Sequence, residues 1–127
     1  MIKLKELLEK KTYSAVLLDE KSRNLLLKTY EDMIPQGWEK ICHHMTIEFN
    51  KLVDNEGTPA TLKVEAVGKS DKALAVKVSG HHSANKIPHI TIAIDRNGGA
   101  KPKNSNDIKD WTNVKDGVTL HGTVKNL

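Results

Sequence analysis

Apolar residues alternate with polar ones along much of this chain, and a period of two residues is typical of half-buried β-strands. The pattern predicts a hairpin over 60–67 and 73–79, with a turn at 68–71. The apolar faces of the hairpin are Leu62, Val64 and Ala66 on one strand and Leu74, Val76 and Val78 on the other. Further strands are expected at 13–19, 40–50, 88–95 and 117–125.

Helical periodicity is limited to short segments. A helix over 2–10 is indicated by the spacing of Leu4, Leu7 and Leu8. A second helix is expected over 22–33, with Ser22 as its N-cap. The residues of this helix expected to face the core are Leu25, Leu26, Tyr30 and Met33. A third short helix is expected near 105–111, after a loop that begins at Arg96.

The order of these elements indicates the fold class. Strands follow one another as hairpins instead of alternating with helices, which favours an α+β fold over a doubly wound parallel sheet. We expect a single domain over 1–127, because 127 residues are enough to enclose one hydrophobic core. Aromatic residues make up only 4% of the chain, so that core must consist mainly of Leu, Ile, Val and Ala.

Composition narrows the possible partners. The net charge of +4 favours anionic partners, but the lysines are scattered instead of forming a dense stripe. A small nucleotide or an RNA end therefore fits better than a long duplex.

The single cysteine, Cys42, excludes an internal disulfide and is expected to pack in the core. No apolar run predicts a membrane span, and the charged first residues argue against a signal peptide, so we expect a cytoplasmic protein. Nothing in the pattern favours a particular oligomeric state.

One short motif occurs twice in the chain. It reads His44-Met45-Thr46-Ile47 in the first copy and His89-Ile90-Thr91-Ile92 in the second. On an extended strand, alternate side chains share a face. Each strand would thus bury its apolar residues on one face and present a histidine and a threonine on the other. Two such strands suggest the two halves of one site.

These residue types suit chemistry at a phosphodiester. An imidazole titrates near neutrality, so one histidine can act as a base while the other holds a proton. Threonine hydroxyls can donate hydrogen bonds to phosphate oxygens. A single His-x-Thr on a strand is common and usually carries no function, but two copies with apolar opposite faces are harder to explain by chance.

Other candidate residues have simpler structural roles open to them. The remaining histidines supply no ligand set with the spacing of a zinc or iron site, so we expect no metal and no other cofactor. His43 is expected to alternate away from His44. Trp38 and Trp111 could stack on a nucleobase or pack in the core, and Trp38 is favoured as the stacking residue. Residues that could contact phosphate or ribose are Tyr13, Arg96, Lys101 and Lys103.

The paired motifs resemble those of the 2H phosphoesterase superfamily, which includes bacterial LigT-like enzymes and the cyclic phosphodiesterase parts of tRNA ligases. The segments 13–19, 34–38 and 42–47 are also similar to short phage-encoded members, among them anti-CBASS nucleases that degrade cyclic oligonucleotides. The resemblance implies a two-lobed fold with antiparallel sheets around a central cleft, one motif from each lobe.

The resemblance further implies roles for the motif residues. His44 and His89 would be the acid–base pair, and Thr46 and Thr91 would hold phosphate oxygens. The implied activity is metal-independent hydrolysis of a nucleotide or oligonucleotide phosphodiester, such as a 2′,3′-cyclic phosphate, a 2′,5′ linkage or a cyclic oligonucleotide. Two other readings are a non-catalytic RNA- or nucleotide-binding module on the same fold, and an interaction protein in which the repeat is accidental.

Overall fold

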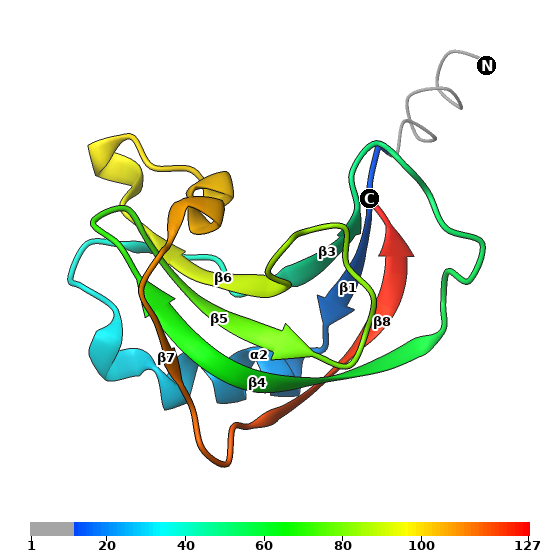
Figure 1. Cartoon of the computed structure of the whole chain (residues 1–127), viewed down its shortest axis with the longest axis horizontal. Coiled ribbons are helices and arrows are strands. Elements are labelled where there is room, and N and C mark those ends of the chain that lie inside the picture. Colours follow the sequence, from blue (N-terminus) through cyan, green and yellow to red (C-terminus); the bar gives the residue numbers. More distant parts are fainter. Residues whose placement is uncertain (1–11) are drawn as a thin grey trace.

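The computed structural model describes residues 12–127, and their principal elements are antiparallel β-strands (Figure 1). The elements, in chain order, are β1 (Ser14–Leu18), α2 (Glu20–Thr29), η1 (Glu31–Met33), β2 (Glu39–Lys40), β3 (His44–Glu48), β4 (Pro59–Lys69), β5 (Ala73–Ser79), β6 (His89–Ile94), η2 (Arg96–Gly98), η3 (Pro102–Asp107), β7 (Trp111–Asn113) and β8 (Thr119–Asn126). The helix expected at 2–10 lies outside the described residues. Within 12–127, no helix is long and apolar enough to cross a membrane.

The strands form one continuous sheet. Its order is β2-β6-β3-β1-β8-β4-β5, with β7 paired to β4. Because β5 also pairs with β6, the sheet closes on itself between these two strands and becomes barrel-like. The antiparallel pairing expected from the sequence is confirmed. The expectation of two separate sheets is wrong, because the strands that carry the two motifs, β3 and β6, are neighbours in the same sheet.

The hydrophobic core lies on the face of the sheet that carries the apolar residues predicted from the alternation. The predicted hairpin is confirmed, since β4 and β5 pair in antiparallel fashion. The six residues of its predicted apolar faces are all buried: Leu62, Val64, Ala66, Leu74, Val76 and Val78. Met45 and Ile47 of β3 and Ile90 and Ile92 of β6 belong to the same cluster. The site is therefore built on strands that are fixed by the main core.

Helix α2 packs against this core and begins earlier than expected. Asp19 is its N-cap, and the carboxylate of Asp19 accepts a hydrogen bond from the backbone N–H of Ser22. Ser22 is therefore not the cap; its hydroxyl accepts a hydrogen bond from the backbone N–H of His121 on β8. Leu26 and Tyr30 are buried in the core, as expected. Leu25 and Met33, which were expected there as well, are exposed.

The strand expected over 40–50 is interrupted at Cys42. This residue has a positive φ of 45°, which an extended strand does not allow, so β2 and β3 are separate elements. Its thiol is fully buried, as expected from the sequence, and burial raises the pKa of Cys42 to about 12. The interruption changes the direction of the side chains that follow, and His43 and His44 are the first of them.

The segment after β6 covers the second face of β5 and β6, as the yellow and orange part of Figure 1 shows. Ile108 and Trp111 pack there over Ala73 and Ala75. A Cβ atom at Gly68 would lie 2.7 Å from both the Ile108 and the Trp111 side chains, so glycine leaves the space that they occupy. The helix expected near 105–111 is wrong: a 3₁₀ helix ends at Asp107 and strand β7 begins at Trp111.

Candidate active site

The two motifs meet where β3 and β6 pair. Met45 and Ile90, the middle residues of the two His-x-Thr triplets, are partners across the two antiparallel strands. Both side chains are fully buried in the core. Since successive side chains on a strand point to opposite faces, the histidine and threonine on either side of each apolar residue are directed away from the core.

All four of these polar residues line one pocket of about 450 Å³: His44, Thr46, His89 and Thr91. The prediction that the two motifs share a cavity is confirmed. The pocket is also lined by Tyr13, Ile41, His43, Phe49, Asn85, Pro102, Lys103 and Asn106. The walls thus come from the start of β1, the end of β3, the loop before β6 and the segment after β6.

His89 is held in one orientation by the backbone. Its Nδ1 lies 2.7 Å from the carbonyl oxygen of Ile87. A carbonyl can only accept, so Nδ1 carries the proton of this hydrogen bond and Nε2 is the nitrogen that gains or loses a proton. The side chain is buried, and this burial lowers the pKa of His89, although the hydrogen bond to Ile87 acts in the opposite direction.

His44 is held by a different partner, the neighbouring histidine. The Nδ1 atoms of His43 and His44 are 2.8 Å apart, and the two rings meet edge to face with centroids 5.0 Å apart. The ring of Tyr13 lies on another side, 5.6 Å from the His44 centroid. Burial lowers the pKa of His44 to about 4, and repulsion from His43 and His89 contributes to the shift. His44 is therefore neutral at pH 7 in the free protein.

The Thr91 hydroxyl lies in a small buried network. Its Oγ1 is 2.7 Å from Ser105 Oγ and donates a longer bond of 3.3 Å to the carbonyl oxygen of Pro102. A hydroxyl has one hydrogen, so while Thr91 donates to Pro102 it must accept from Ser105. The bond to Pro102 is longer than is usual between oxygen atoms, so this hydrogen can be redirected into the pocket with little loss.

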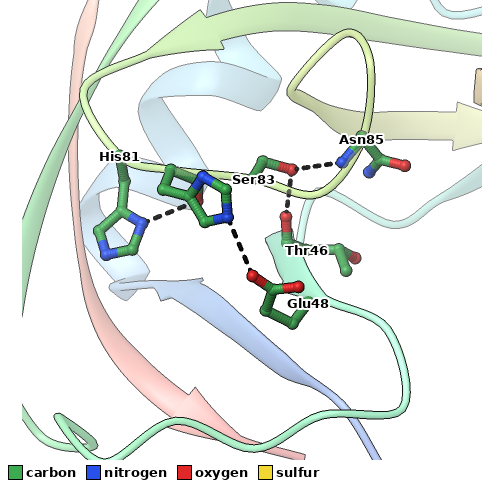
Figure 2. A network of polar contacts seen from close by, with 6 residues as sticks. Thr46, Glu48, His81, Ser83 and Asn85 are labelled. Atoms are coloured by element: carbon green, nitrogen blue, oxygen red, sulfur yellow. Dashed lines mark hydrogen bonds and ion pairs between the residues drawn. The ribbon is translucent and has the colours of Figure 1, made fainter.

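Thr46 is placed by contacts of its backbone. Its carbonyl oxygen accepts a hydrogen bond of 2.6 Å from the Ser83 hydroxyl, and the same hydroxyl accepts from the backbone N–H of Asn85 (Figure 2). These two bonds fix the loop between β5 and β6 against β3 and bring Asn85 to the pocket. On the same loop, His82 Nε2 lies 2.9 Å from a carboxylate oxygen of Glu48.

Several residues singled out from the sequence lie elsewhere. Trp38 does not line the described pocket; it packs against the core, with the Lys69 ammonium 5.8 Å from its ring centroid. Trp38 directly precedes β2, at the end of that strand farther from the motif. Arg96 forms an ion pair with Glu39. Of the expected phosphate or ribose contacts, Tyr13 and Lys103 are at the pocket, whereas Arg96 and Lys101 do not line it.

Trp111 lies closer to the site than Trp38 does. It lines a smaller hollow of about 170 Å³ together with Lys86 and Ser105. Two residues, His89 and Asn106, line both this hollow and the main pocket. The indole N–H of Trp111 donates to the carbonyl of Ile108, which fixes the ring at this position.

The pocket also contains residues that the sequence pattern did not indicate. Phe49 follows the end of β3 at Glu48, is 53% exposed and lines the pocket. His43 was expected to point away from His44 and instead lines the same pocket, because the backbone turn at Cys42 breaks the alternation. Asn85 comes from the loop before β6 and Asn106 from the short 3₁₀ helix η3, where no strand periodicity could reveal them.

Metal ligands do not gather among residues 12–127. No group of three His, Cys, Asp or Glu side chains in this part of the chain is placed to hold a metal ion. The polar groups at the pocket are instead imidazoles, hydroxyls, amides and one ammonium group. This set can donate and accept protons and can hold an anion, which are the operations that hydrolysis of a phosphodiester requires.

A comparison with known protein families agrees with this chemistry. Residues 18–127 match the model of the fungal tRNA ligase phosphodiesterase domain. The chain belongs to this family. It is therefore a phosphodiesterase of the 2H phosphoesterase superfamily, as the paired motifs indicated. No curated protein matches the chain. In this phosphodiesterase the matched region includes both motif strands, β3 and β6.

Proposed function

We propose that this phosphodiesterase hydrolyses a nucleotide or oligonucleotide phosphodiester without a metal ion, with His44 and His89 as the acid–base pair. The observation that carries the proposal is the shared pocket, which both histidines and both motif threonines line. The imidazoles, hydroxyls and amides at this pocket can transfer protons and hold an anion, which supports a mechanism that relies on side chains alone.

The proton transfers follow from the protonation states of the two imidazoles. One neutral histidine takes a proton from the attacking water, or from a ribose 2′-hydroxyl, as the new P–O bond forms. The other histidine, protonated in the complex, gives its proton to the leaving oxygen as the old P–O bond breaks. The pair ends with its protonation states exchanged, and solvent restores them. Both roles require an Nε2 directed to the substrate, which the Nδ1 contacts of both histidines favour.

The threonines hold the phosphate in this proposal. Thr46 can donate its hydroxyl directly, since only its backbone carbonyl is used by Ser83. Thr91 redirects its hydrogen from the Pro102 carbonyl to a phosphate oxygen while it still accepts from Ser105. Lys103 adds a positive charge at the pocket, and Asn85 and Asn106 add amide donors.

The substrate is proposed from the lining of the pocket. Tyr13 and Phe49 offer aromatic rings beside the histidines, and aromatic rings are the usual stacking partners of nucleobases. Candidate substrates are 2′,3′-cyclic nucleotides, 2′,5′-linked oligonucleotides and cyclic oligonucleotides. The similarity to phage anti-CBASS nucleases makes the cyclic oligonucleotides a specific arm of the test.

The test is a panel of these substrates incubated with the protein in excess EDTA. The proposal expects turnover of at least one substrate at an unchanged rate in EDTA, and loss of that turnover in the double variant His44→Ala/His89→Ala. Activity that disappears with chelation and returns with a divalent ion would overturn the metal-independent mechanism. Turnover that survives in the double variant would overturn the assignment of the histidines.

A further inference from the structure

We infer that His43 is a positioning residue for His44: its Nδ1 accepts the Nδ1–H of His44 and so keeps His44 Nε2 free to exchange a proton with the substrate. The inference rests on the proposed function, which it deepens by adding a third histidine to the site. It was not foreseen from the sequence, where His43 was expected to point away from the motif.

The backbone explains why two consecutive side chains can meet. On a regular strand, neighbouring residues point to opposite faces, and their rings could not touch. Here His43 precedes the first residue of β3 and directly follows Cys42, whose φ of 45° turns the chain. The backbone carbonyl of His43 accepts a hydrogen bond from the N–H of Leu18 on β1. The peptide is thereby fixed, and the rings of His43 and His44, which both line the pocket, are in contact.

The distance between the two rings limits where protons can be. At 2.8 Å, the two Nδ1 atoms must have one hydrogen between them. Two bare nitrogens would repel each other through their lone pairs, and two N–H groups would collide. One ring therefore donates and the other accepts, and the Nδ1 state of His43 determines that of His44.

Only one of the two arrangements serves proton transfer. If His43 donates, neutral His44 carries its hydrogen on Nε2 and cannot accept a proton there. If His43 accepts, His44 keeps its hydrogen on Nδ1 whether it is neutral or protonated, and Nε2 gains or loses the second proton. This holds for His44 as base or as acid. It is the arrangement that His89 obtains from the Ile87 carbonyl.

His44 has a side chain, His43, as its partner, whereas His89 has a backbone carbonyl, and this difference has a consequence. A carbonyl oxygen can never donate, so it fixes the tautomer of His89 permanently. A histidine can change roles, so His43 must itself be neutral, with its own hydrogen on Nε2, for the site to work. If both rings were protonated, two N–H groups would face each other across 2.8 Å, so the pair holds at most one extra proton.

The first test reads the tautomer directly and needs no substrate. In protein labelled with ¹⁵N-histidine at pH 7, His44 should show a protonated Nδ1 and a bare Nε2. His43→Asn should preserve this pattern, since Oδ1 of asparagine stands at the same number of bonds from the backbone as Nδ1 and can accept. His43→Leu should lose it. A His44 ring that carries its hydrogen on Nε2 in the unmodified protein, or one that His43→Leu leaves unchanged, would overturn the inference.

The second test is kinetic and includes a matched control. His43→Leu should lower kcat roughly three- to tenfold, which corresponds to the loss of one hydrogen bond, with KM nearly unchanged. His43→Asn should restore kcat, and His121→Leu, an exposed histidine on β8 outside the pocket, should match the unmodified protein. Equal kcat values for His43→Leu and the unmodified protein would contradict the inference. Absence of turnover in the unmodified protein would instead count against the proposed function, since the ¹⁵N test does not depend on it.

Discussion

Met45 lies opposite Ile90 where β3 and β6 pair, and both side chains are fully buried. Next to this pair the backbone N–H of Cys42 donates to the carbonyl of Thr91, so His43 and His44 lie where the pairing along β6 is interrupted. On each strand a histidine and a threonine flank the buried residue, and all four line the same pocket. A phosphate bound at this point would meet a histidine and a threonine from either side.

The first prediction concerns the two histidines of this arrangement. His44→Ala and His89→Ala should each lower kcat by about 10²–10⁴-fold, the usual contribution of a general acid or base. Because both act on one transition state, the double variant should lose less than the product of the single effects. Steady-state kinetics on the best substrate of the EDTA panel would measure this. Loss of less than about threefold in either single variant would show that the corresponding imidazole is not in the reaction.

The second prediction concerns the donors to phosphate. Thr46→Val and Thr91→Val should each lower kcat on the order of ten- to several-hundredfold, because a donor to the developing charge is removed. Ser105→Ala should have a smaller effect, roughly three- to tenfold, since it removes only the bond that orients the Thr91 hydroxyl. An effect of Ser105→Ala that adds fully to that of Thr91→Val would contradict a shared role, because groups that act together are not additive.

The third prediction concerns the loop that brings Asn85 to the pocket. Ser83→Ala removes both the bond to the Thr46 carbonyl and the acceptor of the Asn85 N–H, so KM should rise several-fold more than kcat falls. His82→Ala is the matched control on the same loop. Its contact with Glu48 is a polar contact in which the His82 side chain is 68% exposed, and such exposed contacts contribute little. A larger change in KM for His82→Ala than for Ser83→Ala would contradict this account.

The sequence predicted those parts of the site that follow strand periodicity. The apolar partners of the motifs, Met45 and Ile90, are in the core as expected, and this alone turns the four polar motif residues to a common face. Antiparallel pairing was also foreseen. The closure of the sheet was not, because the pairing of β5 with β6 depends on contacts between distant segments that local periodicity does not encode.

The rest of the pocket depends on backbone conformations that a pattern of residue types does not reveal. Cys42 is not a glycine, so its positive φ could not be anticipated, and His43 was therefore given the wrong direction. Similarly, β3 ends at Glu48, so Phe49 lies outside the strand and is exposed at the pocket. Trp38 was favoured for its closeness in sequence to His44, but closeness along the chain does not determine closeness in space once a strand is broken.

The last prediction concerns pH, and its sign follows from the burial of both histidines. Burial disfavours the charged form, so the pKa of His44 falls to about 4 and that of His89 also lies below its ordinary value. The reaction needs one neutral and one protonated imidazole, so the rate should trace a bell between two macroscopic pKa values that belong to the pair. Since kcat/KM reports the free protein, its maximum should lie below about pH 6.5, the ordinary value for histidine.

A bound phosphodiester reverses part of this shift, because its negative charge favours a protonated imidazole. The maximum of kcat, which reports the complex, should therefore lie at higher pH than that of kcat/KM, roughly between pH 6 and 8. The groups that bear on His44 in the free protein are His43 and His89, and each lowers its pKa. Replacing one motif histidine should remove one limb of the residual profile, and the limb that disappears assigns base and acid. A rate that rises steadily to pH 10 would indicate hydroxide as the nucleophile and would contradict the paired-histidine mechanism.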